Sequence, residues 1–313
     1  MSRALVFPGQ GSQAAGMGRE LAGAFATARD TFQEVDEALR QNLSRLMFEG
    51  PESDLTLTEN AQPALMAMSL AVMRVLERDG KLDLKRHVAF VAGHSLGEYS
   101  ALAAAHSFSL ADAARLLKRR GLAMQRAVPV GAGAMAAMIG IELEAAQALA
   151  EESAQGEVCS VANDNGGGQV VLSGSKAAVE RAITGAAARG AKRAIPLPVS
   201  APFHCALMAP AGREMAEALA GVALRQPYVP LVANVTAAAV AEPEQIKRLL
   251  VEQVTGLVRW RECVLYMKAH DVDQLVEVGA GRVLSGLAKR IDRELATVSL
   301  GAPAEIDAFL KTL

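Results

Sequence analysis

The chain has 313 residues, enough for a large hydrophobic core and for either two domains or one large α/β domain. Hydrophobic residues make up 51% of it, and the formal net charge of −2 is spread without an acidic or basic block. Nucleic-acid-binding proteins normally carry a basic stripe, so the composition argues against that class.

The cysteines and the apolar segments indicate where the protein works. Cys159, Cys205 and Cys263 are odd in number and far apart, which fits a reducing cytosol better than a disulfide framework or a metal site. No signal peptide is recognisable, and the longest apolar segment, residues 64–76, is too short to span a bilayer. We therefore expect a cytoplasmic protein without membrane contact or bound metal. We take it to be a monomer, although no motif sets the oligomeric state.

Strand-like and helical segments alternate along the first part of the chain. Short apolar runs at residues 4–7 and 87–92 predict buried strands. Ala- and Leu-rich helical patterns cover residues 16–41, 63–78, 96–106 and 110–126. This alternation is typical of a parallel sheet with helices on its faces.

A different order of elements begins near Gly131. Strands and helices are predicted in the order β-α-β-β-α-β at residues 134–141, 142–154, 158–162, 169–173, 176–189 and 193–199. This is the order of a ferredoxin-like unit. We therefore expect a small domain at residues 129–200, inserted into a large α/β domain formed by residues 1–128 and 201–313. Further strands, each followed by a helix, are predicted at residues 231–235 and 274–278.

The segment Gly93-His94-Ser95-Leu96-Gly97 lies between a predicted strand and a predicted helix. A serine on such a sharp turn is exposed at the edge of the sheet, and the flanking glycines tolerate the tight backbone. The N–H of Leu96 would lie at the helix N-terminus, where it can donate to an oxyanion. A serine that caps the helix is the competing interpretation. The strand–turn–helix context favours Ser95 as a nucleophile.

A serine nucleophile needs a general base, and the chain has five histidines. We expect His94 to point away from Ser95, its neighbour in sequence. Three others are predicted at element ends without polar neighbours: His87, His106 and His270. His204 lies where the inserted unit returns to the large domain, and clefts form at such junctions. No acid between Ser95 and His204 is an obvious third member, so we predict a dyad whose histidine is oriented by a backbone carbonyl.

A glycine-rich loop at residues 9–14 matches the pattern G-x-G-x-x-A of a dinucleotide-binding turn. However, Pro8 separates the first strand from the glycines, and Asp30 lies in a helical pattern instead of at the end of a second strand. We therefore keep nucleotide binding only as an alternative. The loop can instead present backbone N–H groups to a neighbouring site.

Together these motifs make the chain resemble the malonyl-CoA:acyl carrier protein transacylases of bacterial type II fatty acid synthesis, over essentially its whole length. The resemblance rests on Phe7-Pro8-Gly9-Gln10-Gly11-Ser12-Gln13, Gln62-Pro63-Ala64, Gly93-His94-Ser95-Leu96-Gly97-Glu98-Tyr99, Arg120-Gly121, Met124-Gln125, Gly133-Ala134-Met135-Ala136-Ala137, Phe203-His204 and Glu277-Val278-Gly279. It implies an α/β fold with an α/β-hydrolase-like large domain, containing a parallel sheet, and an inserted ferredoxin-like small domain.

The resemblance also implies roles for the residues of the catalytic centre. Ser95 matches the nucleophile that carries the malonyl ester, and His204 matches its general base. Gln10 and Leu96 match the backbone donors of the oxyanion hole. Gln253 matches the residue whose backbone carbonyl orients the histidine, in agreement with the missing acid.

Three further positions match the residues that bind the acyl group. Arg120 matches the arginine that holds the malonyl carboxylate, although composition alone would place it on a solvated helix face. Gln62 matches a glutamine of the malonyl pocket. Phe203 precedes His204, and in related acyltransferases a phenylalanine there accompanies malonyl whereas a serine accompanies methyl-branched substrates.

The implied reaction transfers malonyl from malonyl-CoA to the phosphopantetheine thiol of acyl carrier protein through a malonyl-serine, with ping-pong kinetics. CoA thioester and phosphopantetheine are then substrates, and no permanently bound cofactor is expected. The alternatives are the malonyl-loading subunit of a malonate decarboxylase or of a polyketide pathway, and a serine hydrolase that releases the free acid.

Overall fold

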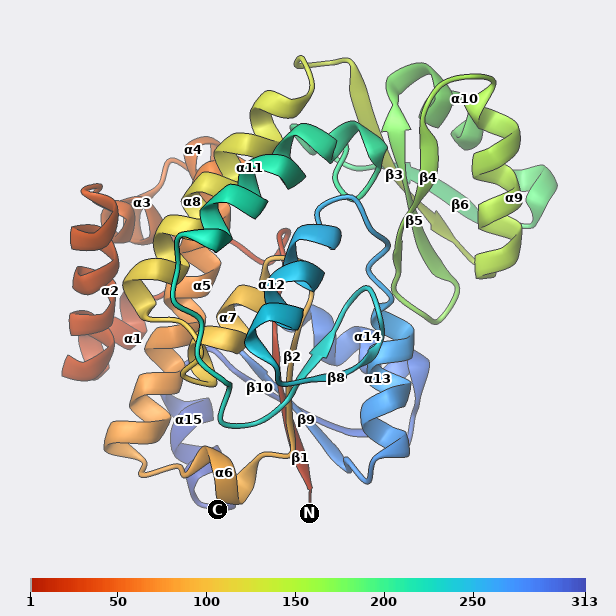
Figure 1. Cartoon of the computed structure of the whole chain (residues 1–313). Helices are drawn as coiled ribbons and strands as arrows, with labels where there is room; N and C mark the ends of the chain where they lie inside the picture. The colour runs from red at the N-terminus through yellow and green to blue at the C-terminus, as the bar shows by residue number, and fades with distance from the viewer. Residues whose placement is uncertain (1) are drawn as a thin grey trace.

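The computed structural model describes residues 2–313, and its larger sheet has the strand order β10-β9-β1-β2-β7-β8 (Figure 1). The strands of this sheet are β1 (Arg3–Phe7), β2 (Phe90–Gly93), β7 (Leu231–Ala233), β8 (Ala238–Val240), β9 (Gln274–Val278) and β10 (Ala296–Leu300). All neighbouring pairs are parallel except β7 and β8, which pair antiparallel. The predicted parallel sheet is therefore confirmed, with one antiparallel edge strand added.

Helices cover both faces of this sheet, as the alternation along β1 requires. Leu5 and Phe7 pack into the larger core, whereas Ala4 and Val6 pack on α13 and α14. The helices and single turns of this part of the chain are α1 (Arg19–Ala24), α2 (Ala26–Leu39), α3 (Leu43–Glu49), α4 (Glu52–Thr56), α5 (Thr58–Arg74), the π-helical turn η1 (Val75–Asp79), α6 (Leu84–His87), α7 (Gly97–Ala104), α8 (Leu110–Ala127), the 3₁₀ turn η3 (Ala206–Met208), α11 (Ala209–Ala220), α12 (Pro243–Glu252), α13 (Trp260–Ala269), α14 (Val283–Ile291) and α15 (Pro303–Leu310).

The smaller sheet is antiparallel and has the strand order β4-β5-β3-β6. It consists of β3 (Gly133–Ile139), β4 (Cys159–Asp164), β5 (Gln169–Ser175) and β6 (Arg193–Pro196), with α9 (Leu143–Ala154), α10 (Lys176–Gly185) and the 3₁₀ turn η2 (Ala186–Arg189) between them. Element order and strand order agree with the predicted ferredoxin-like unit. Figure 1 shows this sheet in green, beside the larger one. The domain boundaries at residues 129–200 stay a prediction.

The two faces of β3 pack against different parts of the molecule. Ala136 and Met138 lie in a core with α9 and α10, whereas Met135 and Ala137 belong to the larger core. Because successive side chains of a strand point to opposite faces, the small sheet is covered by its own helices on one side and turns its other side to the rest of the molecule.

Several predicted bounds were wrong for local reasons. The helix predicted at residues 16–41 is two helices, because Gly18 has a φ of 83° before α1 and Phe25 is extended between α1 and α2. The strand predicted at residues 87–92 begins only at Phe90, after the short helix α6. Strand β7 is followed by β8 and not directly by a helix. None of the helices in residues 2–313 is both long and apolar enough to cross a membrane.

Candidate active site

Ser95 occupies a sharp turn between β2 and α7. Its φ of 54° lies in the left-handed region, which residues other than glycine rarely adopt. A Cβ on Gly93 would lie 1.9 Å from the carbonyl carbon of Gly97, and a Cβ on Gly97 would lie 2.3 Å from the carbonyl oxygen of Phe7. Only glycine fits either position, so the turn has the steep strand-to-helix geometry that exposes a serine hydroxyl.

Asn234, directly after β7, holds this turn from both sides. Its Oδ1 accepts the backbone N–H of Ser95 at 2.8 Å, and its Nδ2 donates to the carbonyl of Gly93 at 2.7 Å. The two backbone partners fix the orientation of the amide, since one can only donate and the other can only accept. Sequence reasoning missed Asn234, because it follows a strand of three residues and belongs to no recognised motif.

Ser95 and His204 are brought together although 109 positions separate them. The Oγ of Ser95 lies 2.7 Å from Nε2 of His204, and Nδ1 of His204 lies 2.9 Å from the backbone carbonyl of Gln253. A carbonyl can only accept, so Nδ1 carries the ring proton and Nε2 presents its lone pair to the hydroxyl. This is the geometry of the predicted dyad with a backbone orienter.

The surroundings of His204 keep its ring neutral. Burial and, to a smaller extent, the positive charge of Arg120 lower the pKa of His204 to about 3, against the opposing effect of the hydrogen bond to Gln253. The imidazole is therefore unprotonated near pH 7 and free to accept a proton from Ser95.

Arg120 lies inside the protein, with only 1% of its surface exposed. Helix α8 approaches α5 closely at Gly121, where a Cβ would lie 2.6 Å from the Cα of Glu59. Arg120 then donates from Nη1 to Oε1 of Gln62 at 2.8 Å, and from Nη2 to Oε1 of Gln253 at 2.8 Å. Nη2 also donates to Oγ of Ser95 at 3.2 Å. The solvated position that composition alone suggested is wrong.

A cavity of about 390 Å³ opens in front of the Ser95 hydroxyl. Its lining combines the predicted site residues with apolar side chains, among them Met135 of β3: Gln10, Gly11, Gln13, Glu52, Thr56, Gln62, His94, Ser95, Leu96, Arg120, Met124, Met135, Asn163, Leu197, Pro198, Val199, Phe203 and His204. Gln253 completes the set from below, through its contacts with Arg120 and His204. All eight predicted site residues therefore lie at one place.

The glycine-rich loop after β1 lies against the Ser95 turn. A Cβ on Gly9 would lie 2.8 Å from the carbonyl oxygen of His94, and the side chain of Gln10 donates to Oγ1 of Thr58 at 3.2 Å. Within residues 2–313, the backbone N–H groups of Gln10 and Leu96 donate to no other group of the protein. The first helix after the loop begins only at Arg19, so the loop lacks the helix N-terminus that a dinucleotide-binding turn uses.

His94 lines the cavity but does not contact Ser95 by a hydrogen bond. Its Nε2 lies 2.9 Å from Oδ1 of Asn165, in the turn between β4 and β5. The same turn contacts α13, because Asp164 pairs with Arg261 at 2.8 Å. The turn between β4 and β5 therefore fastens the small sheet beside the site.

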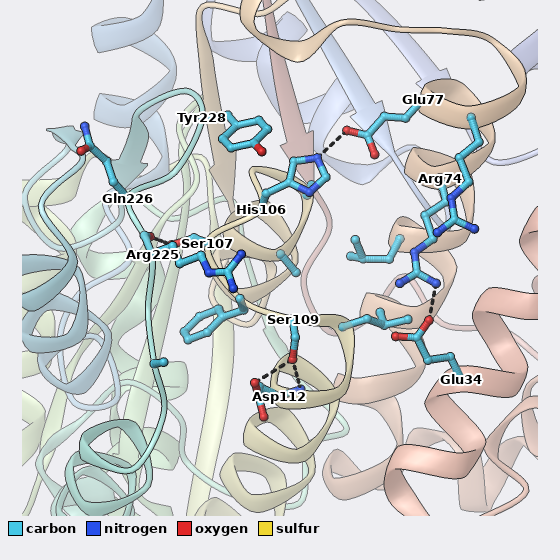
Figure 2. Close-up of a pocket in the computed structure, with 17 residues that line it drawn as sticks. Glu34, Arg74, Glu77, His106, Ser107, Ser109, Asp112, Arg225, Gln226 and Tyr228 are labelled. Atoms are coloured by element: carbon cyan, nitrogen blue, oxygen red, sulfur yellow. Dashed lines mark hydrogen bonds and ion pairs between the residues drawn. The ribbon is translucent and has the colours of Figure 1, made fainter.

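A second and larger cavity, of about 660 Å³, lies at the other end of α7 (Figure 2). His106 points to Glu77 there, with 2.9 Å between Nε2 and Oε1, so the prediction that His106 has no polar neighbour was wrong. Figure 2 also shows Arg74 paired with Glu34, and Ser109 bonded to Asp112. None of the eight predicted site residues lines this cavity.

Glu98 is a buried acid that sequence reasoning quoted in a motif but gave no role. Its two carboxylate oxygens accept from the backbone N–H of Asn234 and from Nε2 of Gln253. It lies beneath the cavity and does not line it. Among residues 2–313, no three side chains of the types His, Cys, Asp and Glu are arranged to hold a metal ion.

Comparison with known proteins agrees with this geometry. The family profile of the acyl transferase domain matches residues 4–296. The chain is 46% identical, over 98% of both chains, to the malonyl CoA-acyl carrier protein transacylase of Escherichia coli strain K12. The acyl-carrier-protein-S-malonyltransferase of Bartonella henselae superposes with a TM-score of 0.97 at 54% identity, covering 100% of this chain and 99% of that one.

A second similar structure contains a partner protein. It is a malonyl-transacylase in complex with its type II PKS acyl-carrier protein, and the transacylase superposes with a TM-score of 0.96 at 43% identity over 100% of both chains. Sequence, fold and site geometry thus agree over the whole length. The chain belongs to the acyltransferase family of the malonyl CoA-acyl carrier protein transacylases.

Proposed function

We propose that this protein transfers the malonyl group from malonyl-CoA to the phosphopantetheine thiol of acyl carrier protein, through a malonyl ester on Ser95. One observation supports this most directly: the buried guanidinium of Arg120 lies 3.2 Å from the Ser95 hydroxyl in the same cavity. A free carboxylate next to the reacting acyl carbon is the group that such a cation would select.

In the first half-reaction Ser95 attacks the thioester carbonyl while Nε2 of His204 takes the hydroxyl proton. The oxyanion that forms accepts hydrogen bonds from the backbone N–H groups of Gln10 and Leu96, and one such donor contributes on the order of 10²–10³ in rate. The tetrahedral intermediate then collapses, the C–S bond breaks, and His204 returns the proton to the departing CoA sulfur.

In the second half-reaction the phosphopantetheine thiol attacks the malonyl-serine. His204 takes the thiol proton and then gives it to Oγ of Ser95 as the ester bond breaks. Serine and histidine therefore return to their starting states after each cycle, and the reaction needs no resident cofactor. We further propose that the protein works as a monomer in the cytoplasm, where its three cysteines stay free thiols.

Arg120 gives the site its preference for malonyl. A charge-assisted hydrogen bond contributes about 1.5–3 kcal/mol, which an acetyl group cannot provide. The bound carboxylate also offsets the positive charge that lowers the pKa of His204, so a malonyl substrate makes the base stronger as it binds. Gln62 holds the guanidinium in place, and Phe203 adds an apolar wall.

Intact-mass spectrometry tests the proposal. Malonyl-CoA without carrier protein should leave one malonyl adduct on the protein, and Ser95→Ala should abolish it. Ser107→Ala is the matched control, since Ser107 lines the larger cavity of Figure 2 and should leave the adduct unchanged. An adduct that persists in Ser95→Ala would overturn the assignment of the nucleophile.

The acceptor is tested by adding holo-carrier proteins to the malonylated enzyme. Transfer to a fatty-acid-synthesis carrier protein is the expected result. The similar malonyl-transacylase in complex with a type II PKS acyl-carrier protein supports a polyketide carrier as a second acceptor. Release of free malonate without transfer to any carrier would instead identify a hydrolase.

A further inference from the structure

Glu98 takes no part in the proposed reaction steps, yet its carboxyl group is buried beside the residues that perform them. It lies on the first turn of α7, three positions after Ser95, and is 1% exposed. Its Oε1 accepts the backbone N–H of Asn234, and its Oε2 accepts from Nε2 of Gln253. A buried carboxylate needs such donors, because an unpaired one would lose its hydration without replacement.

The direction of the Gln253 amide depends on Glu98. Arginine can only donate, so Oε1 of Gln253 must face Arg120, and Nε2 then faces the carboxylate of Glu98. Nε2 also donates to the backbone carbonyl of Ser95 at 2.9 Å. A turned amide would set its nitrogen against the guanidinium and its oxygen against the carboxylate, two repulsive contacts in a buried place.

Two routes lead from Glu98 to the reacting groups. The first passes through Gln253, whose backbone carbonyl orients His204 and whose side chain accepts a hydrogen bond from Arg120. The second passes through Asn234, whose side chain accepts the backbone N–H of Ser95. Both routes begin at one carboxyl group, which touches neither the cavity nor the reacting atoms.

We propose that Glu98 is a positioning residue for acyl transfer: its carboxylate fixes Gln253 and Asn234, and with them His204, Arg120 and the Ser95 turn. The inference rests on the proposed function, because positioning is measured on the acyl-serine reaction. Arg120 forms no ion pair with any carboxylate of residues 2–313, and above about pH 8 the ionised Glu98 places a negative charge behind the Gln253 amide that accepts from Arg120.

The ionisation of Glu98 predicts a pH dependence of the acylation rate. Burial raises the pKa of Glu98 to about 8, against the opposing effects of the two N–H donors and of Arg120. The other buried titratable groups nearby are Tyr99, Cys263, His94, Arg120 and His204. Burial raises the pKa of Tyr99 to about 12, raises that of Cys263 and lowers those of His94 and Arg120, while that of His204 is about 3.

The sign of the pH effect follows from the contacts. The ionised carboxylate accepts from both N–H donors, whereas a protonated oxygen would oppose one of them. Acylation of Ser95 should therefore speed up as pH rises through about 8 and Glu98 loses its proton. Single-turnover acylation by malonyl-CoA, measured from about pH 6.5 to about 9.5, shows this limb in the unmodified protein.

Glu98→Gln keeps the shape but replaces one acceptor by a donor. We expect acylation to be slower by about 10-fold or more at high pH, and the limb near pH 8 to disappear. Glu277→Gln is the matched control, because Glu277 is also fully buried and also accepts two N–H groups, those of Leu284 and Ser285. It should retain the rate and the pH profile per folded molecule.

The possible results distinguish failure of the proposed function from failure of the positioning role of Glu98. An unmodified protein that gains no adduct overturns the proposed function itself. If the protein is acylated but Glu98→Gln matches it in rate and profile, or Glu277→Gln loses as much, the positioning role is wrong. Should Glu98→Gln not fold, Glu98→Asp decides, because it keeps the carboxylate but withdraws it from Asn234 and Gln253; an acylation rate equal to that of the unmodified protein would contradict the positioning role.

Discussion

The two cavities at the ends of α7 contain similar residues and differ in how those residues are satisfied. Each is lined by a serine, an arginine and a histidine. In both cases the histidine backbone lies in the left-handed region, with a φ of 57° for His204 and 60° for His106. The cavity beside His106 is the larger, at about 660 Å³ against about 390 Å³. Neither residue types nor volume therefore distinguish them.

What distinguishes them is the partner of each polar group. In the larger cavity the side chain of His106 is 45% exposed and faces Glu77, while Arg74 faces Glu34. Glu34 offsets the charge of Arg74, and no hydrogen bond joins His106 to a serine of this cavity, because Ser107 bonds to the Arg225 carbonyl and Ser109 bonds to Asp112. In the smaller cavity the buried Arg120 donates hydrogen bonds to two amides and a hydroxyl, and His204 forms hydrogen bonds with a carbonyl and that same hydroxyl. Groups held without a neutralising partner are what a reaction can use.

Removing the cation from the smaller cavity should give the largest effect. We expect Arg120→Ala to slow acylation by malonyl-CoA about 10- to 100-fold and to slow acylation by acetyl-CoA less, because only malonyl loses a charge-assisted bond. Arg119→Ala is the control, since Arg119 lies on the same helix and pairs with Glu214 at the surface. Stopped-flow acylation with both thioesters measures the ratio, and an equal loss for both would contradict the comparison.

The second prediction concerns the glycine turn around Ser95 and the free energy of unfolding. Gly97→Ala is expected to lower the free energy of unfolding by about 3 kcal/mol or more, because the new Cβ would meet the Phe7 carbonyl. Gly286→Ala, in α14 with no atom within 4 Å of the added Cβ, should raise it by about 0.5–1 kcal/mol. Urea unfolding of the two variants gives the answer, and changes of the same sign would show that the close approach is relaxed in solution.

The smallest effect is expected at the larger cavity. His106→Ala removes a partly exposed contact with Glu77, so the free energy of unfolding should change by about 1 kcal/mol or less. The rate of acylation by malonyl-CoA should not change. A several-fold loss would break the contrast between the two cavities, because it would connect the far end of α7 to the chemistry at its start.

The sequence predicted the parts of the fold and site that local patterns encode. The glycines around Ser95 mark a turn whose steric needs are local, and the β-α-β-β-α-β order of the small sheet is a succession of clear periodic segments. Strands β8 and β10 were missed because β8 has only three residues and β10 is only partly buried, so both carry little pattern.

The deeper half of the site could not be predicted from the residues alone. His204 was favoured only by its place at a junction, and Arg120 looked like any helix arginine until the family resemblance was considered. Glu98 and Asn234 become partners through the pairing of β2 with β7, across a separation of 136 positions. Hydrogen bonds between such distant segments leave no trace in local periodicity.

Strand β3 has a consequence for how this enzyme can diversify. One of its faces rests on α9 and α10, and its other face places Met135 in the wall opposite Ser95. The Ser95 hydroxyl follows a strand of the larger sheet, whereas Met135 lies on a strand of the smaller one. Substitutions on that outer face can reshape the space for the acyl group while the turn, the dyad and the buried network keep their geometry. Substrate range and reaction chemistry are then free to evolve separately.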